Sequence, residues 1–185
     1  MASGLPLPLG RPVSAIGRAA AGAAGQETKV NGYMSRQNDL EIEVLFDAPR
    51  EEVFRNWTDP DGIRTWFAPD GFEVTSCSVE ARPGGKWRVA YRSPRGGAEY
   101  VEYGEFRTVD EPERLIFTLT QIEGGRTLLT SLVTVTFTSV SAGTRMRFRQ
   151  TGFDTPAKRD DFQKGWDECF RKLAGSLERP TSGAG

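Results

Sequence analysis

Three aromatic blocks in a fixed order constrain the fold of this 185-residue chain more than any other feature. They span residues 57–69, 82–88 and 165–173, with the sequences WTDPDGIRTWFAP, RPGGKWR and GWDECFRKL. The first is typical of a helix end, a capped turn and a second short helix. The second is typical of a glycine-rich turn before a strand, and the third of one face of a long helix. Together they predict an antiparallel sheet wrapped around a helix, with Trp and Phe between them.

Hydrophobic periodicity predicts the other elements. Apolar residues alternate with polar ones over residues 40–46, which indicates a half-buried strand. Residues 47–49 then begin a helix that buries Val53, Phe54 and Trp57, and residues 59–62 end it and cap a short one. Six further strands are predicted at 71–81, 86–93, 98–109, 114–122, 127–139 and 143–151. Since short turns join them, we expect an antiparallel meander.

An amphipathic helix of about five turns is predicted from Pro156 onward. Its apolar face contains Phe162, Gly165, Trp166, Cys169, Phe170, Leu173 and Leu177. Gly165 costs about 1 kcal/mol of helix propensity relative to alanine. On this face it would let a strand or a ligand approach the helix backbone closely.

The composition divides the chain into one domain and two tails. Residues 1–38 are of low complexity and predicted to be disordered, residues 39–179 form the domain, and residues 180–185 form a second disordered tail. Two explanations of the first tail stay open: a transit peptide, or an extended gene start upstream of Met34. We expect Cys77 and Cys169 to be reduced thiols of a cytoplasmic protein. No apolar run approaches the ~20 residues that span a bilayer.

The net charge and the histidine content limit the classes of partner and of catalytic chemistry that this chain can have. With 24 basic and 25 acidic residues the net charge is −1, so we expect neither nucleic acid nor membrane as a partner. The chain has no histidine, which removes histidine-based nucleophilic pairs, histidine-ligated metals and the usual general base. We therefore expect no metal, no cofactor and no catalytic residue, and an enzyme is less expected than a binding protein.

The ordered set of motifs resembles the homologues of the activator of the 90-kDa heat-shock chaperone ATPase, in the START-like (SRPBCC) helix-grip superfamily. The resemblance covers about residues 39–178. It is carried by Val53, Phe54, Trp66 and residues 47–49, 58–60, 82–87, 104–105, 112–115, 152–153 and 165–166. It implies an α+β helix-grip fold, in which a curved antiparallel sheet surrounds the C-terminal helix above an elongated apolar cavity.

The resemblance also implies a range of functions. The family includes chaperone activators, a self-sacrificing resistance protein against enediyne antibiotics and bacterial domains of unknown ligand. Relatives in the superfamily cyclise polyketides or bind lipids. The eukaryotic co-chaperones carry an additional N-terminal domain, and the 38 leading residues here are too short and too simple to form it.

Our leading hypothesis is non-enzymatic binding of a small apolar or aromatic ligand in the cavity. The predicted aromatic wall consists of Trp66, Trp87, Tyr91, Phe117, Phe148, Trp166 and Phe170, with Gly165 on the helix side. The predicted polar groups are Gln150, Ser131 and either Glu102 or Glu105, since residues 100–107 allow both phases of the strand.

Three alternatives stay open. A partner-binding module of the co-chaperone type would use its surface, and Arg145, Arg147 and Arg149 form one basic strand face that either docks a partner or pairs with neighbouring glutamates. A cyclase or hydrolase of polyketide-like substrates would need a carboxylate facing the cavity. Finally, the large aromatics could simply fill the interior.

Overall fold

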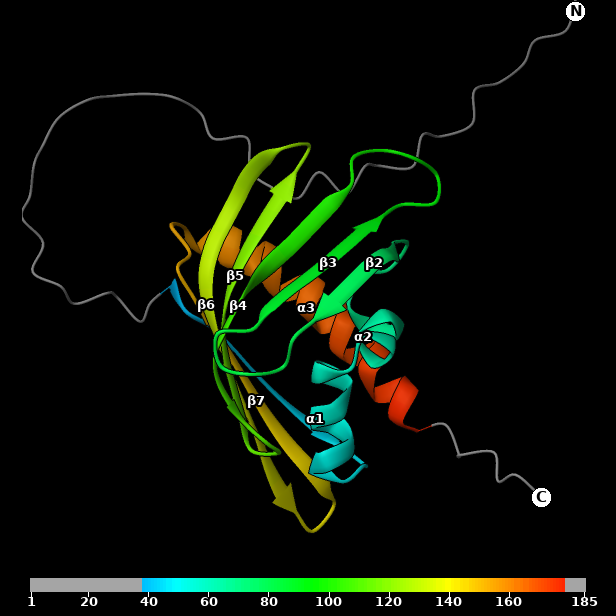
Figure 1. The fold of residues 1–185 in the computed structure, drawn as a ribbon, viewed down its shortest axis with the longest axis vertical. Coiled ribbons are helices and arrows are strands. Elements are labelled where there is room, and N and C mark those ends of the chain that lie inside the picture. The colour runs from blue at the N-terminus through cyan, green and yellow to red at the C-terminus, as the bar shows by residue number, and fades with distance from the viewer. Residues whose placement is uncertain (1–37, 179–185) are drawn as a thin grey trace, which may run out of the picture.

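A computed structural model describes residues 38–178 of the chain. The two predicted disordered tails, 1–38 and 180–185, lie outside the described residues apart from residue 38. The described part is an α+β fold of one seven-stranded antiparallel sheet and three helices (Figure 1). The predicted fold class is confirmed.

The elements follow one another in the predicted order. They are β1 (Leu40–Phe46), α1 (Arg50–Thr58), α2 (Pro60–Trp66), β2 (Glu73–Val79), β3 (Lys86–Arg92), β4 (Tyr100–Asp110), β5 (Arg114–Glu123), β6 (Arg126–Val140), β7 (Gly143–Thr151) and α3 (Pro156–Leu177). The largest differences from the prediction are at β2, which is shorter by two residues at each end, and at α3, which at 22 residues makes about six turns rather than five.

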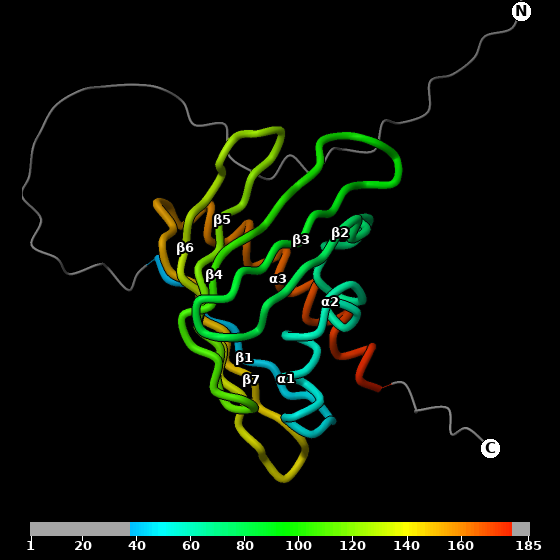
Figure 2. Tube along the Cα trace, in the orientation of Figure 1, coloured from blue at the N-terminus to red at the C-terminus, as the bar shows by residue number. Residues whose placement is uncertain are grey.

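The sheet has the order β1-β7-β6-β5-β4-β3-β2. Strands β2 to β7 form the expected meander of sequential antiparallel neighbours. The first strand pairs with the last, so that Ile42 lies opposite Phe148 although about a hundred residues separate them. Figure 2 shows β1 and β7 side by side at one end of the sheet. Periodicity alone does not predict this pairing, because it reports faces and not neighbours.

Local capping explains where two of the helices begin. The carboxylate of Asp59 accepts a hydrogen bond from the backbone N–H of Asp61 at 3.0 Å, and Pro60 occupies the first turn of α2. The hydroxyl of Thr155 caps α3 in the same way, before Pro156. Both are the side chains and prolines that satisfy a helix N-terminus.

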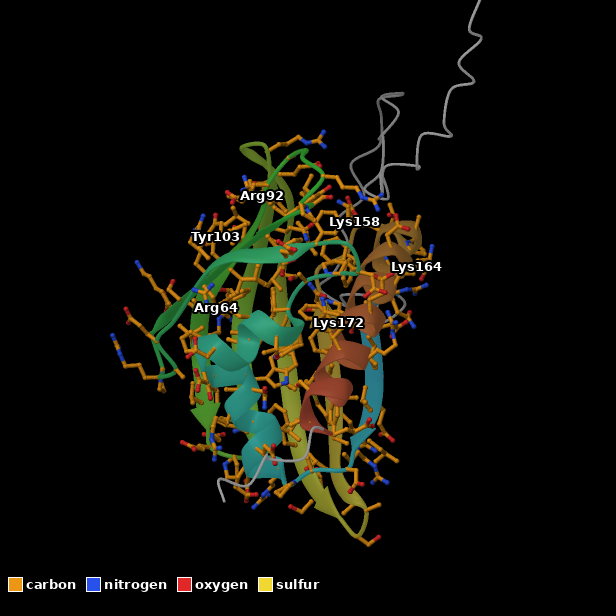
Figure 3. The ribbon with its side chains drawn as sticks, turned by 90° about the vertical axis from the view of Figure 1, so that its right-hand side faces the viewer. Arg64, Arg92, Tyr103, Lys158, Lys164 and Lys172 are labelled. Carbon is orange, nitrogen blue, oxygen red and sulfur yellow. The ribbon has the colours of Figure 1, made fainter. Side chains whose placement is uncertain are left out.

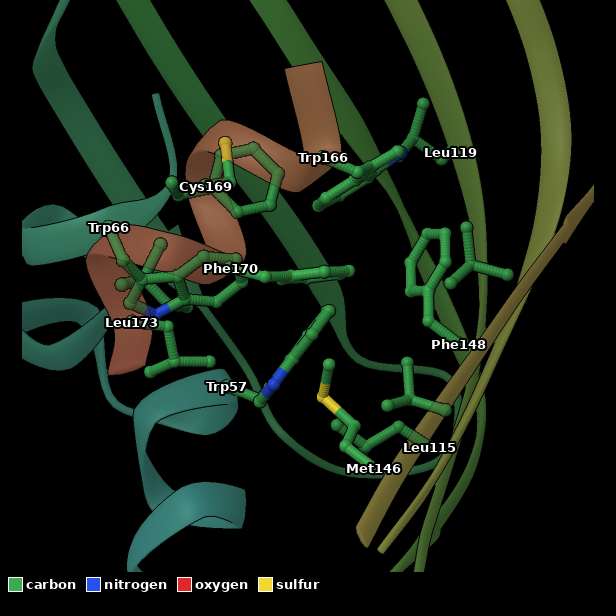
Figure 4. Close-up of a cluster of buried hydrophobic side chains, with 14 of the residues drawn as sticks. Trp57, Trp66, Leu115, Leu119, Met146, Phe148, Trp166, Cys169, Phe170 and Leu173 are labelled. Carbon is green, nitrogen blue, oxygen red and sulfur yellow. The ribbon is translucent and has the colours of Figure 1, made fainter. Parts of the chain in front are cut away.

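The hydrophobic core lies between the sheet and the three helices (Figure 4). Trp57 of α1 is at its centre and is 4% exposed. Its ring centroid lies 4.7 Å from Trp66, 6.2 Å from Phe148 and 6.0 Å from Phe170. Aromatic side chains from α1, α2, α3 and the sheet therefore fill this part of the interior.

The basic face of β7 is paired with acidic residues on β1 and directly before it. Arg147 Nε lies 2.8 Å from Glu43 Oε2, and Arg149 lies 2.6 Å from Asp39 Oδ2. Arg145 also reaches Glu43, at 3.5 Å. Ion pairs at a protein surface contribute little to stability, and these make the arginine face a largely neutralised surface of the sheet.

Candidate ligand-binding cavity

A cavity of about 200 Å³ lies between α3 and the sheet. Its floor comes from β3, β4 and β5, its helical wall from the N-terminal half of α3, and its third side from the segment after α2. It is lined by Phe67, Pro69, Phe72, Tyr91, Tyr100, Glu102, Gln121, Asp161, Phe162, Lys164, Gly165, Trp166, Glu168 and Cys169.

The walls of the cavity are mainly apolar, and six of the fourteen lining residues are aromatic. The rings of Tyr91 and Tyr100 are stacked, with centroids 5.5 Å apart and planes 11° from parallel. Phe72 meets both edge-on, at 6.0 and 5.7 Å. Phe67 meets Trp166 edge-on at 5.6 Å. Such walls offer apolar area and π faces to a ligand.

A polar cluster is buried at the floor of this aromatic space. The Tyr91 hydroxyl donates a hydrogen bond to Glu102 Oε1 at 2.8 Å. The Gln121 amide nitrogen donates to the same oxygen at 2.8 Å and to the Tyr91 hydroxyl at 3.0 Å. All three side chains are at most 6% exposed. Register explains the grouping, because Glu102 of β4 lies opposite Gln121 of β5 and Val89 of β3.

Burial changes the acid–base behaviour of this cluster. It raises the pKa of Glu102 above its usual value, although the hydrogen bonds from Tyr91 and Gln121 oppose the shift. It also raises the pKa of Tyr91 well above the usual range, and the nearby Glu102 adds to that effect. The pKa of the Cys169 thiol is raised by burial first and by Glu102 second. Tyr91 and Cys169 are therefore neutral near pH 7, and Glu102 is the acid of the three whose pKa is shifted toward neutral pH.

Two acceptor atoms of the cluster have no donor. The Gln121 carbonyl oxygen, Oε1, is buried without a hydrogen-bond partner. Both donors to Glu102 reach Oε1, so within residues 38–178 its other oxygen, Oε2, has no hydrogen-bond donor. Buried polar atoms are normally satisfied, so Gln121 Oε1 is an exception, and both acceptors are available to a hydrogen-bond donor in the cavity.

Polar contacts to α3 hold the segment that closes the third side. Glu168 accepts a hydrogen bond from the backbone N–H of Asp70 at 2.9 Å, and Arg171 donates to the Asp70 carboxylate at 2.6 Å. Lys172 donates to the carbonyl oxygen of Ala68. At the mouth, Lys164 projects from α3 into solvent (Figure 3), 3.7 Å from Asp161.

Gly165 leaves open space on the helical wall. A Cβ atom built on Gly165 would meet nothing within 4 Å. The tight approach to the helix backbone that the sequence suggested is therefore absent at this residue, and the space in front of it belongs to the cavity.

Four predicted site residues line the cavity: Tyr91, Glu102, Gly165 and Trp166. The predicted wall residues Trp66, Trp87 and Phe117 instead surround a void of about 20 Å³, which has room for about one water. Phe148 and Phe170 pack in the core. The reason is Trp57, which lies against Trp66, Phe117, Phe148 and Phe170 and occupies the space they would otherwise line.

Of the predicted polar site residues, only Glu102 lines the cavity. Gln150 and Ser131 are buried but bonded to each other at 2.9 Å, and neither lines the cavity. Glu105 is exposed on the outer face of the sheet, so Glu102 is the glutamate that faces inward.

Sequence reasoning missed Gln121, Tyr100, Phe72 and Phe162 as cavity residues. A signal existed for Gln121, since it continues the inward period of Leu115, Phe117 and Leu119 on β5. Phe162 is on the predicted apolar face of α3. Tyr100 shares the strand phase of Glu102, which the sequence left open, and the placement of Phe72 depends on the turn before β2.

A metal site and a membrane-spanning helix each require features that the described residues lack. No group of three or more potential metal-ligating side chains occurs within residues 38–178. None of the helices in that range is both long and apolar enough to cross a bilayer.

A curved antiparallel sheet closed over a long C-terminal helix, with a cavity between them, is the helix-grip architecture of START-like proteins. The chain belongs to the Activator of Hsp90 ATPase homolog 1-like protein family, whose model matches residues 47–178. None of the curated proteins matches the chain significantly.

Solved structures of bacterial proteins share this fold. A putative uncharacterized protein from Rhizobium leguminosarum is 27% identical, with a TM-score of 0.69 over 77% of this chain and 95% of that one. A protein from Rhodobacter sphaeroides is 26% identical, with a TM-score of 0.65 over 75% of this chain and 91% of that one. The AHSA1 protein from Silicibacter pomeroyi is 23% identical and has a TM-score of 0.68 over 75% of this chain and 96% of that one, a likeness of fold alone.

Proposed function

We propose that this protein binds a small apolar or aromatic ligand, without transforming it, in the cavity between α3 and strands β3 to β5. The observation that carries the proposal is the cavity itself. Protein interiors are close-packed and leave few voids larger than a water, whereas this space has about 200 Å³ and mainly apolar walls.

The cavity volume indicates the size of the ligand. An engineered apolar cavity of about 150 Å³ binds benzene. A space of about 200 Å³ accordingly suits one ring with a short side chain, and its open mouth leaves room for a longer one. Burial of apolar surface contributes roughly 25 cal/mol per Å², and the Glu102 cluster orients the polar end.

The surface-partner alternative has less support. Its basis was the arginine face of β7, and those arginines are paired with Glu43 of β1 and with Asp39, which directly precedes β1. A docking patch needs charged side chains that are not already paired within the protein.

We also propose a cytoplasmic location, in keeping with the free thiols of Cys77 and Cys169.

An enzyme that cyclises or hydrolyses polyketide-like substrates is the second candidate, and Glu102 favours it. That alternative needs a cavity-facing carboxylate, and a buried carboxyl with a raised pKa can serve as a general acid. A turnover experiment distinguishes ligand binding from catalysis. A turnover product that forms with the parent protein and not with Glu102→Gln, while both bind the substrate, would favour the enzyme.

Dye binding in two matched variants tests the proposed function. The probe is the environment-sensitive apolar dye N-phenyl-1-naphthylamine, titrated by fluorescence. Gly165→Leu should fill the open space in front of the helical wall and abolish dye binding. Gly175→Leu makes the same change on the exposed side of the same helix and should leave dye affinity unchanged. Circular dichroism shows whether both variants keep the native fold.

The dye titration can also contradict the proposed function. Unaltered dye affinity in folded Gly165→Leu would place the ligand outside this cavity and would overturn the proposal. Native mass spectrometry of freshly purified protein adds an independent readout, because a co-purifying small molecule that Gly165→Leu no longer retains would identify the ligand class.

A further inference from the structure

We propose that the ligand of this cavity carries a protonated amine on its aromatic or short alkyl body, and that the ammonium group donates hydrogen bonds to Glu102 Oε2 and Gln121 Oε1. This inference rests on the proposed function and assigns the chemistry of the ligand's polar end.

The side-chain hydrogen-bond donors of Tyr91 and Gln121 are all used within the polar cluster. A tyrosine has one O–H and a glutamine amide has two N–H donors. The Tyr91 hydroxyl is used on Glu102, and the Gln121 amide is used on Glu102 and Tyr91. Two acceptors on neighbouring side chains remain: Gln121 Oε1, which is buried without a partner, and Glu102 Oε2, which receives no hydrogen bond from residues 38–178. A carbonyl, ether or carboxylate cannot satisfy them, and a single hydroxyl supplies only one donor.

Charge favours a cation over a neutral donor. The hydrogen-bond partners of Glu102 among the described residues are neutral, so the ionised carboxylate would be buried without a counter-ion. The charged residues of the lining are Glu102, Asp161, Glu168 and Lys164, and Lys164 already lies 3.7 Å from Asp161. Acidic groups therefore outnumber basic ones, which repels anionic ligands and attracts an ammonium.

The aromatic walls add to this preference. Tyr91 and Tyr100 present stacked rings beside the carboxylate, and Phe72 packs edge-on against both. Tyrosine faces attract a nearby cation through the ring quadrupole. An aromatic enclosure around one carboxylate is thus suited to an organic cation with an apolar body.

Binding of an amine should be coupled to release of a proton. The side chains that face Glu102 are Tyr91 from β3, Gln121 from β5 and Cys169 from α3. Tyr91 and Cys169 keep their protons because burial raises the pKa of each. Burial also raises the pKa of Glu102 in the empty cavity, and an ammonium beside the carboxylate lowers it again. A proton that the Glu102 carboxyl holds in the empty cavity is released to solvent as the ammonium–carboxylate pair forms.

A pair of probes that differ only at the polar end tests the inference. They are 2-phenylethylamine and its neutral counterpart 2-phenylethanol, titrated by calorimetry in two buffers of different ionisation enthalpy. We expect the amine to bind about tenfold more tightly than the alcohol or better, with release of up to about one proton. The alcohol should release none.

The isosteric variant Glu102→Gln keeps the shape of the cavity. It should lower amine affinity by about tenfold or more, remove the proton release and leave alcohol affinity within about twofold. Glu105→Gln makes the same substitution on the exposed face of the same strand and should change neither probe.

The outcomes of the titrations distinguish failure of the amine assignment from failure of the proposed cavity function. Equal affinity for the two probes, or unchanged amine affinity in Glu102→Gln, would overturn the amine assignment and leave the proposed cavity function intact. Failure of both probes in a protein that still binds the dye would also overturn the amine assignment. Failure of both probes and the dye would overturn the proposed function as well.

Discussion

The indole nitrogen of Trp166 donates a hydrogen bond to Gln150 Oε1 at 2.8 Å, which connects α3 to β7 through the core. The Gln150 amide then donates to the Ser131 hydroxyl at 2.9 Å, and that hydroxyl donates to the carbonyl oxygen of Leu119 at 3.2 Å. One chain of buried hydrogen bonds thus runs from the helix across β7 and β6 to β5. Because Trp166 also lines the cavity, the same chain positions one of its walls.

Trp166→Ala should lower the free energy of unfolding by about 3–5 kcal/mol, the range for loss of a buried aromatic. Trp166→Phe keeps a ring but leaves Gln150 Oε1 without its donor, and should cost about 1–3 kcal/mol. Urea unfolding measures both. A denaturant midpoint equal to that of the parent protein for Trp166→Ala would show that this face of α3 does not hold the helix to the sheet.

Glu102→Gln should alter the pH dependence of stability. Because burial raises the pKa of folded Glu102 above its usual 4.5, the folded state binds more protons than the unfolded state between that value and the raised pKa. The contribution of Glu102 to stability is thus full below about pH 4.5 and decreases as the pH rises through this window. Glutamine does not titrate, so the variant should gain on the parent protein between about pH 4 and about pH 8.

Urea midpoints of the two proteins at both pH values measure this difference. Glu105→Gln is the matched control, since it makes the same substitution at an exposed position of the same strand. Parallel pH profiles for Glu102→Gln and its parent would mean that Glu102 titrates alike in the folded and unfolded states.

Gly104→Ala should be among the most destabilising glycine substitutions in the sheet. A Cβ atom at Gly104 would lie 1.7 Å from the carbonyl oxygen of Thr118, which accepts the hydrogen bond of the Trp87 indole at 3.1 Å. We expect a loss of about 1–3 kcal/mol or more from overpacking. Gly165→Ala faces open space in a helix and should instead gain about 0.5–1 kcal/mol. Thermal unfolding compares the pair, and a neutral Gly104→Ala would contradict the close strand approach at this position.

Removal of residues 1–33, so that the chain begins at Met34, should change stability by less than about 1 kcal/mol. The core residues described here extend from Leu40 to Leu173 and pack against one another. This expectation follows from the predicted domain boundaries, 39–179, and the low complexity of the preceding segment. Thermal unfolding of the full and shortened chains measures it, and a large decrease in melting temperature would show that the deleted segment packs on the domain.

The sequence by itself determined the local structure of this protein. The period of two along β5, the Asp59 cap of α2 and the apolar face of α3 each depend on residues close together in the chain. The order of strands β2 to β7 followed as well, since short turns leave sequential strands few other partners. The family resemblance added the curvature of the sheet around the helix.

Only the tertiary structure decided which inward-facing residues line open space. Phe117 and Tyr91 both lie on inward faces, yet Trp57 from α1 packs against Phe117, whereas Tyr91 lines the cavity. The inward phase of Glu102 was likewise set by pairing with β3 and β5, because the sequence of β4 has apolar residues in both phases. Faces follow from periodicity within one element, whereas a cavity depends on the side chains that several distant elements bring to the same place.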